Sequence, residues 1–558
     1  MKDYLTSGSP GTSELLFLPL GGAGEIGMNL NLYGHDGAWL MVDLGVSFGE
    51  DYIPGIDAVM PDPSFIVERR DSLSGLVLTH AHEDHLGAVP HLWPELQCPV
   101  YATSFAASML RRKLYEFGLE DKVSLIEVPL SSQFDVGPFG IELISLTHSI
   151  PEPNALVIRT SVGAVMHTGD WKFDDDPVVG EPSDEEALRR AGDDGILAMV
   201  CDSTNALVSG SSGSEGALVD HLQDLISGLD KRVAVGCFAS NVARLQTIAQ
   251  VAQNCDREVV LVGRSLHRMN EIARENGIFD NLASFVSEEE GGYLPRDKVL
   301  YICTGSQGEP RAALARIARG DHREVKLELG DAVIFSSRVI PGNELEISRL
   351  QNKFLSDGID VITADDADIH VSGHPACDEL AEMYQFIRPE IAIPVHGEIR
   401  HLIAHQKIAE ACQVPHTVLA PNGSLVRLDV AGPQIIDQVP TGRLGVDGHR
   451  LVELDSFPMR ERRRLQATGA VAVTVILKRR GKLATEPEVS SFGLIDEDKE
   501  EHIIFDAIDA ATYAIEHLSK RQRDRDEAII EAVKRDVRQV FRRALGKKPI
   551  IHVHLIYI

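Results

Sequence analysis

The residues with the clearest chemical potential form the run HAHEDH at positions 80–85, which places three imidazoles and two carboxylates within six residues. The apolar residues just before it predict the end of a buried strand. Because side chains at positions i and i+2 of an extended segment point the same way, His80 and His82 can converge on one metal ion. Asp84 and His85 come where the sequence turns into a helix, and can face a second ion. Imidazole nitrogen with carboxylate oxygen suits zinc, or manganese at lower affinity.

Two metal shells need more ligands than this run supplies, and other predicted strand ends offer them. His148 follows the sequence ISLT at residues 144–147, and Asp170 follows the sequence MHTG at residues 166–169. His396 lies in the sequence PVHGE at residues 394–398. We therefore expect ligands to come together from segments that are far apart in the chain.

The elements that must position these residues follow from the rhythm of the sequence. Up to about Asn205, short apolar runs alternate with Gly, Asn and Asp turns, which predicts a strand-rich, mixed α/β region. A Ser/Gly-rich link at residues 209–214 is typical of a flexible domain junction. Beyond it, a strand, a Gly/Ser loop and a helix follow one another repeatedly, which predicts a parallel sheet with covering helices. The strands are expected at residues 232–237, 258–262, 299–303 and 332–335.

The loops of this second region indicate an anionic ligand. In open parallel sheets, ligands bind beyond the carboxyl ends of the strands, and free amides at helix starts favour phosphate. Helix capping and tight turns explain each loop taken singly. Four such loops in one domain favour the anion.

Histidines return between residues 365 and 427, and we interpret this as the chain re-entering the first domain, which makes the second an insertion. A single strand–helix–strand unit would bring His374 and His396 to the same sheet edge. A basic stretch at residues 460–464 then leads to a small final domain with a strand at residues 470–477, a second near 489–495, two helices and a last strand. A dimer contact or an RNA contact is the modest interpretation of this module.

Length and composition restrict the number of domains and the class of protein. A chain of 558 residues is too long for one core and predicts about three or four domains. Its 44% hydrophobic and 25% charged residues are typical of a globular protein, and seven scattered cysteines indicate free thiols in a reducing compartment. The polar start predicts no signal peptide, and no apolar stretch is long enough for a membrane, so we expect a cytoplasmic protein. The net charge of −30 argues weakly against nucleic acid, since bound metal and local arginines can make one channel positive.

Together, these motifs resemble the metallo-β-lactamase superfamily, and Asp43 in VDLG matches its first motif. Asp202 in CDST, His374 in the run HVSGH and His396 look like the three signatures of its β-CASP nucleases. The resemblance covers essentially the whole chain and points to the bacterial ribonuclease J family. It implies an α/β fold, a metallo-β-lactamase αββα sandwich with an inserted parallel α/β β-CASP domain and a small C-terminal α+β domain. The expected boundaries are 1–208 and 365–445 for the sandwich, 209–364 for the insertion, 446–465 for a linker and 466–558 for the final domain.

Carried over residue by residue, the resemblance implies two zinc ions per chain, with manganese or magnesium as alternatives. His80, His82 and His148 would hold one ion, Asp84, His85 and His396 the other, and Asp170 would bridge them. Two metals would acidify a shared water for in-line attack on a phosphodiester. His374 is the candidate proton donor to the leaving 3′-oxygen, held by Asp202. His374 as a further metal ligand, with Asp202 as a strand-end cap, stays an alternative.

The resemblance also implies a path for single-stranded RNA, with a pocket for a 5′-monophosphate and degradation from 5′ to 3′, next to endonuclease activity, in rRNA maturation and mRNA decay. Capping explains the serines of this path equally well. A homodimer or homotetramer, without membrane attachment, is expected. The alternatives are a metallo-hydrolase of small esters and an inactive RNA-processing scaffold. The residues expected along the path are Ser240, Asn241, Arg264, Ser265, His370, Val371, Ser372, Gly373 and His374.

Overall fold

The computed structural model describes residues 9–49, 53–479 and 481–558. Residues 1–8, on which the expectation of no signal peptide partly rests, lie outside the described part. The chain divides into two compact units, one formed by residues up to 47 together with 60–441, and one formed by 48–59 together with 442–558. Among the described helices, none combines the length and the apolar character needed to cross a membrane.

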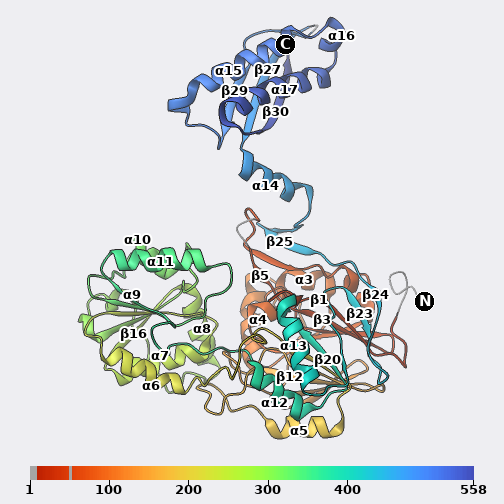
Figure 1. Ribbon diagram of the computed structural model, residues 1–558, viewed down its shortest axis with the longest axis vertical. Coiled ribbons are helices and arrows are strands. Elements are labelled where there is room, and N and C mark those ends of the chain that lie inside the picture. Colours follow the sequence, from red (N-terminus) through yellow and green to blue (C-terminus); the bar gives the residue numbers. More distant parts are fainter. Residues whose placement is uncertain (1–8, 50–52, 480) are drawn as a thin grey trace. The chain divides into compact units, whose positions relative to one another are not determined.

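Two mixed sheets face each other in the first unit and form what we call the sandwich lobe (Figure 1). The eight-stranded sheet has the order β24 (Gln434–Gln438), β23 (Ser424–Arg427), β1 (Leu16–Gly21), β3 (Leu30–His35), β4 (Ala38–Val42), β7 (Leu73–Val77), β8 (Val100–Ala102) and β9 (Leu125–Glu127). The seven-stranded sheet has the order β10 (Gln133–Val136), β11 (Phe139–Ser145), β12 (Asn154–Arg159), β13 (Ala164–His167), β14 (Ala198–Asp202), β20 (Ile391–Val395) and β22 (His416–Thr417).

Apolar side chains from both sheets make the core of the sandwich lobe. Phe17 and Tyr33 from one sheet share a buried cluster with Phe139 and Ile393 from the other. A second buried cluster joins the other face of the seven-stranded sheet to helices α5 (Glu185–Asp194), α12 (Cys377–Ile387) and α13 (Ile399–Ala411). The alternation of inward and outward side chains along each strand is what makes both faces usable.

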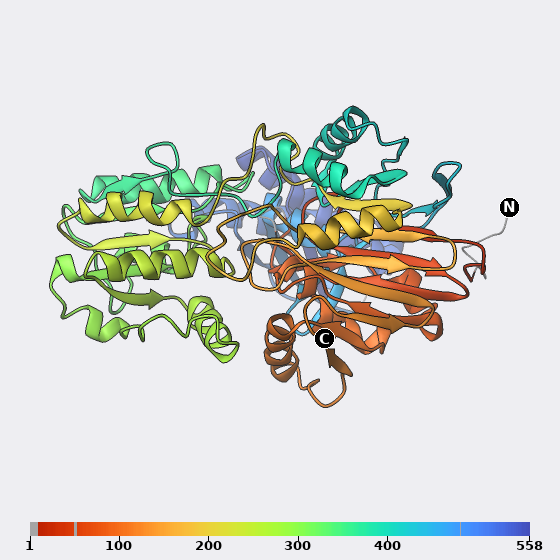
Figure 2. The ribbon, with the colours of Figure 1, turned by 90° about the horizontal axis from the view of Figure 1, so that it is seen from below.

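A parallel five-stranded sheet forms the second part of this unit, the inserted lobe, in the order β16 (Glu258–Val262), β17 (Val299–Cys303), β15 (Val233–Gly236), β18 (Ala332–Phe335) and β19 (Asp360–Ile362). Its first four strands in chain order confirm those predicted from the sequence. Helices α6 (Ala217–Ser227) and α7 (Val242–Asn254) lie on one side of the sheet, and α10 (Ala313–Arg319) and α11 (Glu344–Ser356) on the other (Figure 1 and Figure 2). Helix α8 (Arg264–Glu275) follows β16.

The inserted lobe interrupts the seven-stranded sheet between two adjacent strands. β14 pairs with β20 in parallel, from Ala198 opposite Ile391 to Asp202 opposite Val395, although the whole lobe lies between them in the chain. The predicted return of the chain is therefore confirmed.

Two details of the crossing segments differ from expectation. The Ser/Gly-rich link is not free, because the buried carboxylate of Glu379 accepts hydrogen bonds from the backbone and the hydroxyl of Ser212, at 2.8 and 2.7 Å. The predicted strand–helix–strand unit is also wrong in its first element. His374 lies on an irregular loop, residues 368–376, and only α12 and β20 follow it. That loop bonds to side chains such as Asn205 and Asp202, instead of to a strand.

Two small sheets lie mainly in the second unit. One has the order β26 (Arg450–Glu453), β25 (Arg443–Asp447), β6 (Ala58–Pro61), β5 (Ser47–Phe48). The other centres on β27 (Ala470–Lys478), which pairs with β28 (Lys482–Leu483), β29 (Glu488–Phe492) and β30 (Ile550–Tyr557). Helices α15 (Glu497–Glu516) and α17 (Asp526–Leu545) pack on it, as predicted, while β28 and the short helix α16 (Lys520–Arg523) were not foreseen. The segment 446–465 contains β26 and most of α14 (Phe457–Thr468), and the domain boundaries given above stay predictions.

Candidate metal centre

The HAHEDH run lies where β7 ends. His80 and His82 occupy the loop after the strand, and the short helix α2 (Glu83–Leu86) turns Asp84 and His85 toward them. This helix packs against backbone at Gly45, where a Cβ atom would stand 1.6 Å from the carbonyl oxygen of Asp84. Only glycine allows that approach, which places the helix at the mouth of the sheet edge.

The remaining sequence-predicted ligands come from loops of the other sheet. His148 follows β11, Asp170 follows β13, and His396 follows β20 with a left-handed backbone of φ 50°. Left-handed φ in a non-glycine residue is uncommon and clusters at functional sites. All three side chains are less than a tenth exposed. The sandwich thus gathers residues that are hundreds of positions apart along the chain.

The first group of donor atoms consists of His80, His82, His148 and Asp170, whose ligand atoms lie within 4.8 Å of one another. His80 Nε2 and His148 Nε2 each lie 3.1 Å from His82 Nδ1. They lie 3.8 and 3.9 Å from Asp170 Oδ2. The spacing leaves one point that all four atoms can reach.

The second group consists of Asp84, His85, Asp170 and His396, again with ligand atoms within 4.8 Å of one another. His85 Nε2 lies 3.2 Å from Asp170 Oδ2 and 3.7 Å from Asp84 Oδ2. His396 Nε2 lies 3.2 Å from the same oxygen of Asp84. The structure therefore brings all seven expected ligands together, in the two sets that the resemblance implies, with Asp170 in both.

The chemistry of these donors fits a pair of divalent cations. Imidazole nitrogens that face one another at 3.1 Å repel unless a proton or a cation lies between them. Among the described residues, the buried Asp170 Oδ1 receives no hydrogen bond, although His396 Nδ1 lies 3.1 Å away. Buried polar atoms are normally satisfied, so this oxygen has capacity for a ligand that the protein itself does not supply.

Electrostatics divides the two groups. Burial lowers the pKa of each histidine in the first group, so these imidazoles are neutral and offer lone pairs. Burial also opposes protonation of His85 and His396, but the carboxylate of Asp170 and its neighbours outweighs it and raises both pKa values well above the usual range. In the second group, a dication would therefore displace protons.

A carboxylate outside the two groups orients one of the ligands. Asp43 follows β4 and is fully buried, with φ 62°. Its Oδ2 lies 2.6 Å from His85 Nδ1, and both carboxylate oxygens accept hydrogen bonds from Thr79, each at 2.8 Å. A carboxylate on the far nitrogen fixes the ring and leaves Nε2 free for a metal. Sequence reasoning matched Asp43 to a motif but missed Thr79, which directly precedes His80.

His374 and Asp202 lie beside the second group. His374 Nδ1 is 2.8 Å from Asp202 Oδ2. Burial lowers the pKa of His374, but Asp202 and Asp170 outweigh it and raise it above 6.5. A third set of donor atoms, within 4.8 Å of one another, joins these three residues to His396. The geometry fits a proton donor and a further ligand alike, so both interpretations stand.

Two residues that sequence reasoning missed hold this corner in place. Thr204 Oγ1 donates to Asp202 Oδ1 at 2.8 Å and lies 3.1 Å from His396 Nδ1. Asn205 Nδ2 donates to Ser372 Oγ at 2.7 Å and to the carbonyl of His374 at 3.0 Å. They lie two and three residues after Asp202, and this position in the sequence was the available signal.

The residues expected along an RNA path fall into two places. Gly373 stands against the metal cluster, because its carbonyl accepts a hydrogen bond from His148 Nδ1. Asn241 is the N-cap of α7, where its side chain accepts from the Arg244 amide at 2.8 Å, so capping accounts for it. Arg264 and Ser265 begin α8, at a helix start without a side-chain cap. Ser240 lies just before α7, and His370 and Val371 lie on the loop that leads to His374.

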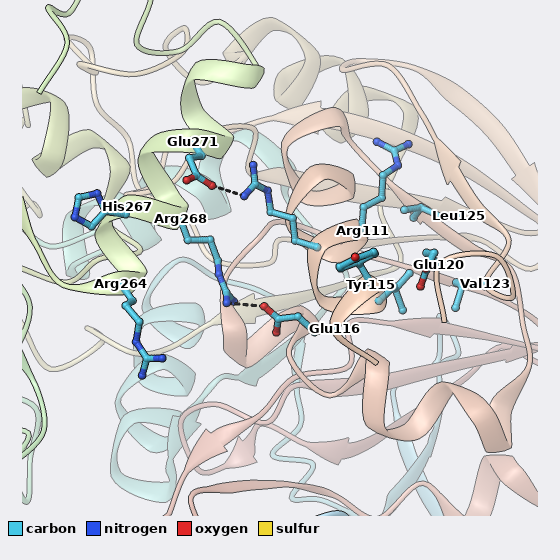
Figure 3. Close-up of a pocket in the computed structure, with 12 residues that line it drawn as sticks. Arg111, Tyr115, Glu116, Glu120, Val123, Leu125, Arg264, His267, Arg268 and Glu271 are labelled. Carbon is cyan, nitrogen blue, oxygen red and sulfur yellow. Dashed lines mark hydrogen bonds and ion pairs between the residues drawn. The ribbon is translucent and has the colours of Figure 1, made fainter. Parts of the chain in front are cut away.

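Arg264 also lines a hollow of about 820 Å³ between α8 and α4 (Ser104–Glu116) (Figure 3). Ion pairs cross this hollow, and the aromatic ring of Tyr115 is largely exposed beside it. The hollow is separate from the metal donors, since it contains none of them. Its lining residues are Arg111, Arg112, Leu114, Tyr115, Glu116, Glu120, Val123, Leu125, Arg264, His267, Arg268 and Glu271.

Comparison with known families agrees with this arrangement. Residues 53–185 match a beta-lactamase superfamily domain, and residues 230–354 match the beta-CASP domain of ribonuclease J. Residues 361–418 match a Zn-dependent metallo-hydrolase RNA specificity domain, and residues 457–558 match the ribonuclease J C-terminal domain. The α/β fold with an inserted lobe is therefore confirmed.

A solved structure of a protein of unknown function from Enterococcus faecalis shares the fold, with a TM-score of 0.51 at 16% identity, over 75% of this chain and 100% of that one. Ribonuclease J of Sinorhizobium meliloti is 44% identical, over 97% of each chain. Ribonuclease J of Mycolicibacterium smegmatis is 39% identical over 86% of each chain, and that of Corynebacterium glutamicum is 38% identical over 86% of this chain and 67% of its own. Four domain matches, and 44% identity over nearly the whole length of a ribonuclease J, show that this chain belongs to the ribonuclease J family.

Proposed function

We propose that the protein is a metal-dependent ribonuclease that hydrolyses RNA phosphodiesters. The observation that supports this most is the pair of donor groups that share Asp170, each with its ligand atoms within 4.8 Å of one another. The names of the related proteins, all ribonuclease J, point to the same substrate. Zinc is the ion we favour, two per chain, because nitrogen donors outnumber oxygen donors in the first group.

The seven ligands would hold the two ions, which when bound acidify a water and neutralise the charge that builds on the phosphodiester. Neighbouring residues of the chain hold the reacting groups in position. Asp43 keeps the His85 ring in one orientation, and Thr204 holds Asp202 in place. The buried surroundings exclude bulk water and strengthen each of these interactions.

His374 is the residue we assign to protonation of the departing 3′-oxygen. Because Asp202 accepts the hydrogen bond of Nδ1, the second ring nitrogen, Nε2, is left to carry the transferable proton. The carboxylate also stabilises the protonated ring, which keeps a donor available near neutral pH. If His374 is instead a metal ligand, its removal lowers the metal content as well as the turnover.

For the direction of degradation, we propose a 5′-to-3′ exonuclease that prefers a 5′-monophosphate, with endonuclease activity beside it. This proposal is supported by the contact of the Gly373 carbonyl with His148 and by the neighbouring Ser372 hydroxyl, because amide and hydroxyl groups beside the metal donors suit a terminal phosphate. A homodimer or homotetramer through the final domain belongs to the same proposal.

The metal assignment is tested by comparing two buried aspartates that are four residues apart. Asp170 belongs to both donor groups, whereas Asp174 pairs with Lys172 at 2.7 Å. We expect Asp170→Asn to lose bound metal and all activity. Asp174→Asn should keep two metal ions per chain by elemental analysis and lose only thermal stability. Equal metal content in the two variants would contradict the assignment.

Matched RNAs with a 5′-monophosphate or a 5′-triphosphate test the direction. Mononucleotides released from the monophosphate form alone would support the exonuclease. Internal fragments from both RNAs would favour endonuclease action, and no product from the metal-loaded protein would favour an inactive scaffold. In parallel, His374→Ala should lower turnover with the metal content intact, and loss of metal in that variant would reassign His374 as a ligand.

A further inference from the structure

A fully buried arginine occupies the neck through which the chain enters and leaves the inserted lobe. Arg244 lies in the first turn of α7 and is 0% exposed. Its Nε donates to Glu215 Oε1 at 2.6 Å, and its Nη2 donates to Glu215 Oε2 at 2.9 Å. Glu215 stands on the segment by which the chain enters the lobe. This forked pair is the strongest hydrogen-bonding geometry available to arginine.

The other side of the same guanidinium bonds to the end of a strand and to the exit segment. Arg244 Nη1 donates to Ser336 Oγ at 2.7 Å, just after β18, and to the carbonyl of Ile369 at 3.3 Å. The Ser336 hydroxyl also donates to the Ile369 carbonyl, at 2.7 Å. One side chain therefore joins the entry segment, the carboxyl edge of the parallel sheet and the loop that leads to His374.

The contact with His370 has a defined proton arrangement. Arg244 Nη1 lies 3.2 Å from His370 Nδ1, and arginine only donates. In this contact Nδ1 can only accept, which favours the neutral tautomer with its proton on Nε2. Burial, and then the positive charges of Arg244, Arg338 and Lys172, lower the pKa of His370 to about 3. At physiological pH the ring is a neutral hydrogen-bond donor with a fixed tautomer.

We propose that Arg244 is a positioning residue for RNA binding, which holds residues 369–371 and locks His370 as an Nε2–H donor for a phosphate oxygen of the RNA. The proposal rests on the function proposed above. It adds a residue that touches neither metal nor substrate, and it gives a role to the neutral histidine on the loop that leads to His374. A neutral donor binds phosphate without having to gain a proton, so its contribution does not fade as the pH rises above 7.

A buried ion pair is by itself weak evidence of function, because breaking it destabilises any protein. The inserted lobe offers a matched control. Arg257 is also buried, 6% exposed, and donates to the carbonyls of Lys231 at 2.7 Å and Val299 at 3.2 Å, with a further bond to Leu229. These partners precede or begin the strands, so Arg257 lies at the amino edge of the sheet whose carboxyl edge Arg244 serves.

The experiment compares Arg244→Lys with Arg257→Lys, because lysine keeps the charge but loses the fork. Both variants should melt at a lower temperature and keep the wild-type metal content. We expect Arg244→Lys alone to lower kcat/KM for 5′-monophosphorylated RNA on the order of a hundredfold, mostly through KM, and to reduce the preference over 5′-hydroxyl RNA. Equal kinetics in the two variants, after correction for the folded fraction, would overturn the proposal.

A second measurement is independent of activity. In protein labelled with ¹⁵N-histidine, the ring signals that disappear in His370→Asn identify His370. In the wild type they should show an unprotonated Nδ1 and a protonated Nε2 from pH 6 to 8. In Arg244→Lys this tautomer should become mixed, while in Arg257→Lys it should not change. An unchanged tautomer in Arg244→Lys would refute the locking role even if the protein proved inactive on RNA, a result that would instead bear on the proposed function.

Discussion

Two of the places where the inserted lobe meets the sandwich lobe use the same residue types in opposite settings. At the neck, Arg244 and Glu215 are 0% and 4% exposed. Between α4 and α8, Arg112 Nη1 lies 2.6 Å from Glu271, and Arg268 Nη2 lies 2.6 Å from Glu116, with 29–59% of each side chain exposed (Figure 3). The distances are nearly equal, so distance does not distinguish them.

Solvent does. Charges that remain in water interact weakly and are screened by salt, so exposed pairs contribute about 0–1 kcal/mol. A buried charge whose partner is removed keeps its desolvation cost, which amounts to about 3–5 kcal/mol. The hollow beside α4 and α8 leaves these pairs in contact with water, whereas the neck is dry. Of these two contacts, we therefore expect the neck to be the more rigid and the α4–α8 contact to be the more adjustable.

The largest expected effect is loss of the buried partner. Glu215→Ala leaves the Arg244 guanidinium buried without its carboxylate, and we expect the inserted lobe to lose about 3–5 kcal/mol of unfolding free energy. Because the pair is dry, this loss should be the same in low and high salt. Denaturant titration with a probe in the inserted lobe measures it.

Glu116→Ala is the matched control at the exposed contact, where the same truncation should cost less than about 1 kcal/mol. Equal losses in the two variants would mean that burial does not separate the contacts, and the comparison would fail.

How much of this arrangement was predictable depends on where the information lies in the chain. The strands at 258–262, 299–303 and 332–335 form at the predicted residues, because continuous apolar runs bounded by glycine and serine specify buried parallel strands locally. The metal donors were identified because their residue types are improbable in any other role. Both signals are carried by short stretches of sequence.

The parts that escaped prediction depend on partners distant in the chain. Arg244 sits in an ordinary helical pattern, and its partners lie 29 and 92 residues away. The loop before α12 was predicted as a strand, but side chains such as Asn205 take its hydrogen bonds, which no local pattern reveals. The role of Thr79 likewise became apparent only when Asp43 was placed beside it.

A change of pH should have an intermediate effect on stability. It tests the neck alone, because the neck contains a neutral histidine, His370. His370 has a pKa of about 3 in the folded protein, against about 6.5 when unfolded. Between these two pH values the unfolded chain binds more protons at His370 than the folded protein does. The contribution of the neutral His370 to stability is therefore complete above pH 6.5 and is lost as the pH falls. At pH 5 the loss is about 2 kcal/mol.

Asparagine can accept the Arg244 hydrogen bond and does not titrate, so His370→Asn should remove this part of the acid sensitivity. Unfolding curves at pH 7.5 and pH 5 measure it, with the exposed His221→Asn as the control. A wild-type pH dependence in His370→Asn would show that the ring is not held neutral.

The smallest effect should come from the exposed contact, where a double-mutant cycle isolates one pair. Arg268→Gln and Glu116→Gln, alone and combined, should give a coupling energy of about 0.2–1 kcal/mol in dilute buffer. In molar salt the Debye length falls to about 3 Å, and the coupling should vanish. Arg268 Nη2 and Glu116 Oε1 lie only 2.6 Å apart, so a tight pair shielded from solvent is the competing interpretation. A coupling energy that does not change with salt would mean that the contact is dry and rigid. In that case both contacts would be rigid, and the proposed RNA path between the lobes could not widen without breaking one of them.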